Sequence, residues 1–89
     1  MKAVITVTGK DSMGIIAGVA GVCAELGANI VDISQSVLQE YFAMIMLADI
    51  DKLNVDFAQF VDTLEAFGTQ KDLTIHAMHE DIFNTMHHI

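Results

Sequence analysis

The hydrophobic period of this chain changes on either side of a glycine-containing turn at residues 9–14. Before the turn, residues 3–8 are rich in β-branched side chains and alternate, which predicts a strand with one buried face. After the turn, apolar residues between Met13 and Leu26 recur at helical spacing. Gly27 follows as a residue suited to a left-handed helix end. The first unit is therefore predicted to be a strand, a tight turn and a helix.

The remaining sequence predicts three further strands and two further helices. The predicted strands are residues 29–38, 41–48 and 73–78, the first two joined by a tight connection at residues 39–40. A second helix is expected to run from an Asn54 cap to Phe67, and a short amphipathic helix to cover residues 80–88. The order β-α-β-β-α-β with a tail helix predicts an α+β, ferredoxin-like sandwich. In that fold two helices cover one face of a four-stranded antiparallel sheet.

Composition limits the class of protein and its partners. The 89 residues have room for one domain, residues 1–89, and 53% of them are hydrophobic. The core of a chain this short cannot bury all of its apolar side chains. A second copy of the chain could cover the remaining apolar surface, so we expect a homodimer. The formal net charge of −8 predicts no binding to nucleic acid or to anionic membranes. We expect a cytoplasmic protein, because no signal peptide or membrane span is evident and the single cysteine has no partner in the chain.

Two patterns in the sequence predict how the elements pack. Residues 41–48 are apolar at successive positions, which predicts that both faces of the sheet are covered at this strand. Gly18 and Gly21 lie on one stripe of the first predicted helix, where each glycine costs roughly 1 kcal/mol relative to alanine. Another backbone is expected to pack there, from either the second helix or the first helix of a partner.

The turn itself can be interpreted in two ways. A helix begins there with unpaired amide hydrogens and a partial positive charge, and glycines let a ligand approach the backbone. With no arginine in the chain, the backbone amides would hold a ligand carboxylate, with Lys10 as the nearby cation. An ammonium group could be met by Asp11 or Asp32. In the alternative, Asp11 or Ser12 caps the helix and nothing binds.

Residues 11–36, DSMGIIAGVAGVCAELGANIVDISQS, contain an acidic residue, two positions, Gly-Ile, an apolar helix, a glycine near its end, and Asn-Ile-x-Asp. This pattern resembles the signature of the ACT domain family, and the predicted element order extends the similarity over nearly the whole chain. The chain is most similar in character to small UPF0237-like stand-alone ACT proteins. It also resembles the ACT domains of glycine cleavage repressor-type regulators and of formyltetrahydrofolate deformylases, which share an NI-x-D-x-x-Q run.

The resemblance implies a non-catalytic regulatory protein that binds an amino acid or similar small ligand as a homodimer, without a cofactor. A regulated protein is a further implied partner. The ligand would lie between the first turn of one copy and the second strand of the other. The implied ligand-binding residues are Asp11, Ser12, Met13, Gly14, Ile15, Asn29, Ile30 and Asp32. Met13 stands where many ACT domains have proline. The alternative function is a ligand-independent structural or protein-interaction dimerisation domain.

The sequence favours no enzyme and no metal site. A Cys-x-x-Cys pair is absent, and no arginine is available to grip a phosphate. His76 and His79 would point to opposite faces of a strand, and His87 and His88 to different faces of a helix. We therefore expect no metal.

Overall fold

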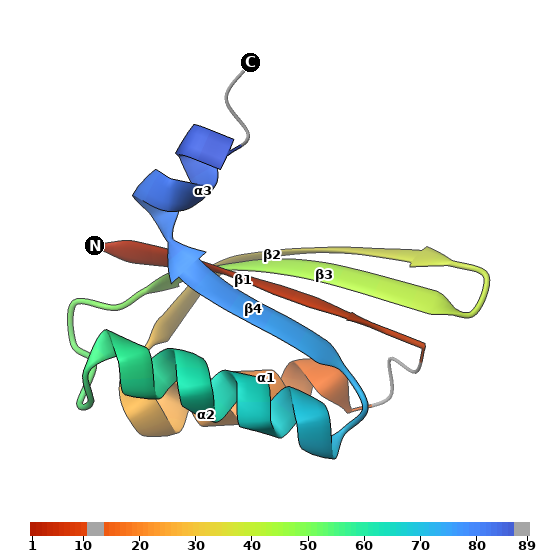
Figure 1. The fold of residues 1–89 in the computed structure, drawn as a ribbon, viewed down its shortest axis with the longest axis horizontal. Coiled ribbons are helices and arrows are strands. Elements are labelled where there is room, and N and C mark those ends of the chain that lie inside the picture. The colour runs from red at the N-terminus through yellow and green to blue at the C-terminus, as the bar shows by residue number, and fades with distance from the viewer. Residues whose placement is uncertain (11–13, 87–89) are drawn as a thin grey trace.

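The computed structural model describes residues 1–10 and 14–86 and has the predicted element order (Figure 1). The strands are β1 (Lys2–Gly9), β2 (Asn29–Leu38), β3 (Tyr41–Asp49) and β4 (Thr74–His79). The helices are α1 (Ile15–Leu26), α2 (Phe57–Gln70) and α3 (Glu80–Met86).

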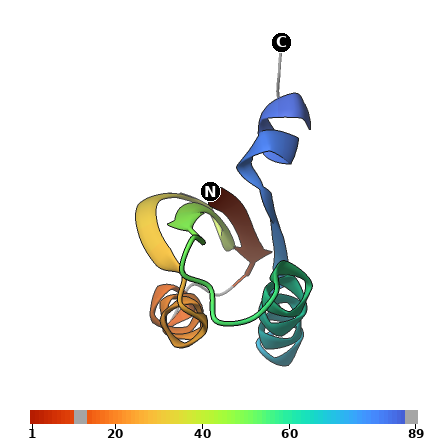
Figure 2. The ribbon, with the colours of Figure 1, turned by 90° about the vertical axis from the view of Figure 1, so that its left-hand side faces the viewer.

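The strands form one antiparallel sheet in the order β2-β3-β1-β4. α1 and α2 lie side by side beneath one face of this sheet, and α3 projects away on the other side (Figure 2). The arrangement confirms the predicted ferredoxin-like sandwich with a short C-terminal helix. None of the described helices is long and apolar enough to cross a membrane.

The core lies between the sheet and the two long helices. Ala3, Ile5 and Val7 are fully buried on the face of β1 predicted from the sequence. They pack in one cluster with side chains such as Phe60 and Leu64 of α2. The centre of the sheet is thereby fixed against the helices.

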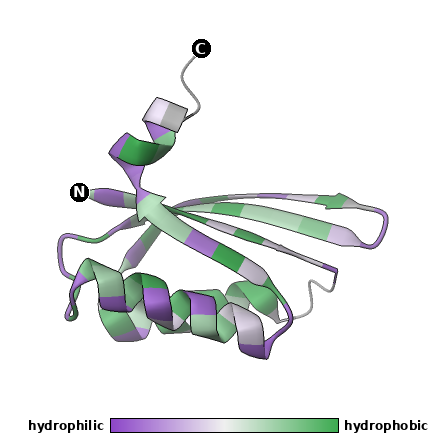
Figure 3. Cartoon of the chain, viewed as in Figure 1, coloured by the Kyte–Doolittle hydropathy of each residue, from purple (hydrophilic) through white to green (hydrophobic). Residues whose placement is uncertain are grey.

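The opposite face of the sheet is largely uncovered. Along β3, Met44 and Met46 are buried against the helices, while Tyr41 and Ile45 remain 52% and 46% exposed. The prediction that both faces would be covered at this strand is wrong within the described residues of one protomer, because α3 packs chiefly against β1 and β4. Along the strands, residues of differing hydropathy follow one another (Figure 3). We call the uncovered surface of the sheet the open face.

The two helix glycines have different surroundings. A Cβ atom at Gly18 would meet the ring of Phe67 on α2, so this glycine serves packing within one chain. At Gly21 nothing lies within 4 Å of the same position. The second helix of the same chain is therefore the close neighbour at Gly18, and no residue that the structure describes lies close to Gly21.

Two helix ends differ from prediction. α2 begins at an Asp56 cap, whose carboxylate accepts a hydrogen bond from the Gln59 amide at 2.8 Å. Asn54, the predicted cap, instead donates its side-chain amide to the Glu25 carbonyl at 2.8 Å. α2 also continues past Phe67 to Gln70. α3 ends at Met86 within the described residues, and residues 87–88 of the predicted tail helix lie outside them.

Candidate functional site

The N-terminus of α1 forms the described part of the predicted ligand site. Gly14 occupies the cap position with φ 73°, a left-handed conformation that glycine adopts without strain. It has no side chain to cap the first amides of the helix, and nothing lies within 4 Å of its Cβ position. The side chain of Ile15 is buried in the core, so Ile15 offers only its backbone to a ligand. Asp11, Ser12 and Met13 lie outside the described residues.

The other predicted residues lie at the far end of the protomer. Asn29 pairs with Asp49, which pairs with Lys2 at the start of β1. Gly9, next to the turn, is level with Phe42 and Val37. Eight positions of strand, from 29 to 37, correspond to roughly 25 Å. Gly14 caps the start of α1 and Asn29 follows its end, and the twelve residues of this helix span roughly 16 Å. One protomer therefore does not bring Asn29 and Gly14 together.

Ile30 and Asp32 flank an irregularity in the pairing of β2 with β3. Ile30 is partly buried against the core, whereas the Asp32 side chain is exposed. The Asp32 carboxylate accepts a hydrogen bond from the Ile33 amide at 2.9 Å. Asp32 is thus accessible for an ammonium group, and Ile30 offers little more than its backbone.

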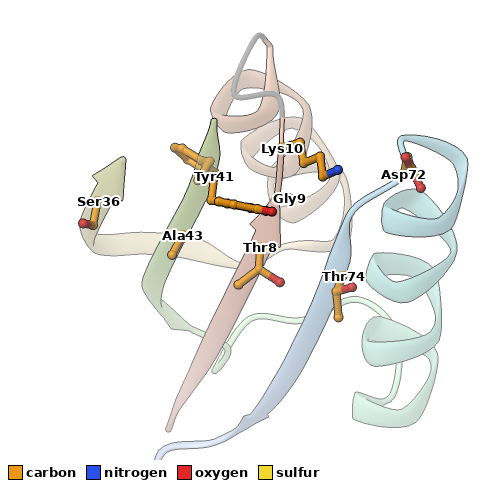
Figure 4. Close-up of a pocket in the computed structure, with 9 residues that line it drawn as sticks. Thr8, Gly9, Lys10, Ser36, Tyr41, Ala43, Asp72 and Thr74 are labelled. Carbon is orange, nitrogen blue, oxygen red and sulfur yellow. The ribbon is translucent and has the colours of Figure 1, made fainter. Parts of the chain in front are cut away.

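A cleft of about 620 Å³ opens at the end of the open face, beside Gly9 and Lys10 (Figure 4). It lies where β1 ends and where β3 and β4 begin. We call it the strand-end cleft. Its described lining residues are Thr8, Gly9, Lys10, Ser36, Tyr41, Phe42, Ala43, Asp72 and Thr74.

Opposite charges flank this cleft. The Lys10 side chain extends toward the side on which Asp72 lies (Figure 4), and its ammonium is 5.9 Å from the centroid of the Tyr41 ring. Among the described residues, neither Lys10 nor Asp72 forms an ion pair. A cation and a carboxylate therefore remain available on the rim.

The backbone around Gly9 brings these charges to the same end of the sheet. A Cβ atom at Gly9 would collide with the side chain of Leu73, so glycine permits the close approach of the segment before β4. The Leu73 amide donates to the Gly68 carbonyl at 2.7 Å, and Asp72 adopts φ 59° in this turn. Asp72 is thus held by the end of α2.

Sequence reasoning identified Lys10 but missed Tyr41, Asp72 and Thr74 as its neighbours. A signal that could have found them is the predicted ferredoxin-like fold, because in the observed strand order the end of β1 lies beside the starts of β3 and β4. The positions of the side chains could not be predicted from the sequence, because the conformation of the loop before β4 sets the position of Asp72.

Other reactive groups do not assemble a site. The described residues contain no group of three His, Cys, Asp or Glu side chains placed to hold a metal ion. His76 and His79 lie on different faces of β4 as predicted, because they pair with Thr6 and Ala3 of β1. Both contact α2 at the sheet edge: a His76 nitrogen lies 3.9 Å from the Glu65 carboxylate, and His79 stacks on Phe57 with ring centroids 4.0 Å apart. Burial raises the pKa of the Cys23 thiol to about 11, which makes it a poor nucleophile.

The fold and the family model agree on the class of protein. Residues 2–78 match the ACT domain model, so the chain belongs to the ACT domain family. A UPF0237 protein from Clostridium perfringens is 47% identical over 89 residues, covering 100% of both chains.

Comparison with solved structures also supports the ACT domain fold. An ACT domain protein from Streptococcus pneumoniae has a TM-score of 0.82 at 49% identity, covering 93% of each chain. A candidate glycine cleavage system transcriptional repressor has a TM-score of 0.70 at 28% identity, covering 86% of this chain and 44% of that one. Formyltetrahydrofolate deformylase from Pseudomonas syringae, at 18% identity, shares the fold. The resemblance predicted from residues 11–36 is confirmed.

Proposed function

We propose that this protein is a non-catalytic regulatory module that binds a small amino-acid-like ligand between two copies of the chain. The observation that carries the proposal is the separation of Gly14 and Asn29, which lie beyond opposite ends of α1 in one protomer. A site that uses both residues needs two chains.

Pairing along β2 would supply that geometry. β2 is an edge strand of ten residues, and in the sequence of this strand Asp32 is the one charged residue. Val31 and Val37 are 51% and 64% exposed on it. Such an edge is a template for another strand, and the usual protective lysine or proline is missing from its sequence.

Two β2 strands paired antiparallel about a twofold axis run in opposite directions. Asn29 of one copy would then lie toward the Leu38 end of the other copy. That end is level with Gly9, five residues before Gly14 in the sequence. The amides at the start of α1 would meet the ligand carboxylate, and Asp32 or Asp11 its ammonium. Ser12 and Met13 would complete the turn.

Binding would then favour the paired arrangement, because the ligand contacts both chains. This coupling is how a protein without catalytic groups could regulate a partner protein. The competing function is a dimerisation domain that needs no ligand. It is favoured by Ile15 and Ile30, whose partly or fully buried side chains contribute little to a pocket.

The test combines sedimentation equilibrium with calorimetry against the standard amino acids at millimolar concentration. We expect a mass of two chains, and at least one amino acid that binds and strengthens the association. Asn29→Ala should abolish this response, whereas Ser34→Ala, on the same strand, should retain it. A dimer that responds to no amino acid and is unchanged by Asn29→Ala would refute ligand binding and support the dimerisation domain.

A further inference from the structure

We propose that the strand-end cleft is a second ligand site, complete in one protomer, for a small zwitterion with a large apolar side chain. It lies on the open face and includes neither Asn29 nor Asp32. The proposal therefore does not rest on the dimer or on the site between copies. Of the described residues that line the cleft, Ser36 alone belongs to β2, the strand proposed to pair.

The size of the cleft suits a small molecule. About 620 Å³ lies within the ~300–1,000 Å³ typical of such sites. Thr8 and Thr74 are directly opposite in the β1–β4 register and expose their side chains on the floor of the cleft (Figure 4). Their hydroxyl groups can donate or accept hydrogen bonds beneath a ligand.

The charges select a zwitterion. Lys10 offers a cation and Asp72 a carboxylate, and no ion pair among the described residues neutralises either group. A ligand carboxylate at Lys10 and a ligand ammonium at Asp72 would satisfy both. A polyanion such as a nucleotide would meet one cation, would be repelled by Asp72, and would face a chain with a net charge of −8.

The apolar wall selects a large side chain. Tyr41 is 52% exposed and presents its ring beside Lys10, and Ala43 is exposed next to it on β3. An aromatic or branched ligand side chain could cover the ring and the alanine methyl. Glycine, which has no side chain to place there, should bind at least tenfold more weakly, because each buried methylene contributes about 0.8 kcal/mol.

The experiment is an amide-resolved NMR titration of the full chain with L-phenylalanine, L-leucine and L-methionine, each to about 10 mM, well above a ~1 mM dissociation constant. We expect saturable shifts at Thr8, Ala43 and Thr74. The fragments 3-phenylpropanoate and 2-phenylethylamine, each lacking one charge, should bind at least tenfold more weakly than L-phenylalanine.

Charge-removing variants provide the decisive comparison. Asp72→Asn keeps a residue that tolerates positive φ and should weaken L-phenylalanine binding about tenfold, as should Lys10→Gln. Lys71→Gln removes a neighbouring charge outside the cleft and should have no effect.

The two sites fail in different ways. Shifts confined to Gly14, Ile15 or Asn29 and unaffected by Asp72→Asn would overturn the cleft and support the site between copies. Shifts at Thr8 and Thr74 that Asp72→Asn weakens and Asn29→Ala does not would support the cleft, whatever the fate of the other site. No saturable shift with any of the three amino acids would also overturn the proposal.

Discussion

Replacing Gly27 with alanine should destabilise the protein more than the same change at Gly14. Both glycines have positive φ, 85° and 73°. They differ in their surroundings, because a Cβ atom at Gly27 would collide with the Lys52 carbonyl oxygen and lie 3.3 Å from the Asn54 amide nitrogen. At Gly14 the same atom would have no described residue within 4 Å. Comparing the two variants therefore separates the cost of backbone strain, which both share, from the cost of the steric collision at Gly27.

The expected magnitudes follow from these contacts. An alanine in the left-handed region costs about 1–2 kcal/mol at either position. At Gly27 the 52–54 segment must also move, and Asn54 ties it to α1 by hydrogen bonds to the Leu26 and Glu25 carbonyls at 2.9 and 2.8 Å. Weakening both bonds adds about 1 kcal/mol each. We expect Gly27→Ala to lose about 3–4 kcal/mol of unfolding free energy.

Urea unfolding followed by circular dichroism measures this difference. Each variant should be unfolded at several protein concentrations, so that any contribution from dimer dissociation is separated from that of the fold. Equal losses for the two variants would refute the argument, since the Lys52 carbonyl would then be free to move without consequence. A loss at Gly27 smaller than that at Gly14 would refute it more strongly.

Three further changes test other parts of the fold. Gly21→Ala should stabilise the protein by about 1 kcal/mol in the same urea assay, because helix propensity rises and nothing occupies the new Cβ position. Asp56→Ala should cost about 1 kcal/mol by removing the cap on the Gln59 amide, whereas an unchanged midpoint would show the cap to be replaceable by water. Cys23 should react with Ellman's reagent at pH 8 only after urea is added, because its pKa is about 11 and its side chain is buried. The thiol loses its proton near pH 9 in the unfolded chain and near pH 11 in the folded protein, so the free energy of unfolding should decrease as the pH rises from about 9 to about 11. Cys23→Ala should remove this contribution to the pH dependence.

The element order was predictable because hydrophobic period and glycine positions act locally. Residues 3–8 and 29–38 fall within or match the strands of the structure, and Gly27 ends α1 in the left-handed conformation expected of it. The start of α2 was not predictable in the same way. Asn54 and Asp56 are both good caps, and tertiary packing against Glu25 decides between them.

The predicted site was harder to judge from sequence, because its two halves are related through space and not along the chain. The motif identified Gly14 and Asn29, but only the structure shows that α1 holds them apart in one protomer. The strand-end cleft was missed for the opposite reason. Its lining residues, such as Lys10 and Asp72, are distant in sequence but line the same cleft. The loop that places Asp72 there has no hydrophobic periodicity from which its conformation could be predicted.

The distance between Gly14 and Asn29 has a thermodynamic consequence. Twofold pairing along β2 would create two equivalent positions, each completed by both chains, so ligand uptake and subunit assembly would become one linked equilibrium. Diluting the protein would then weaken apparent ligand affinity, and adding ligand would offset dilution. Such a molecule senses the product of its own abundance and that of the metabolite it takes up.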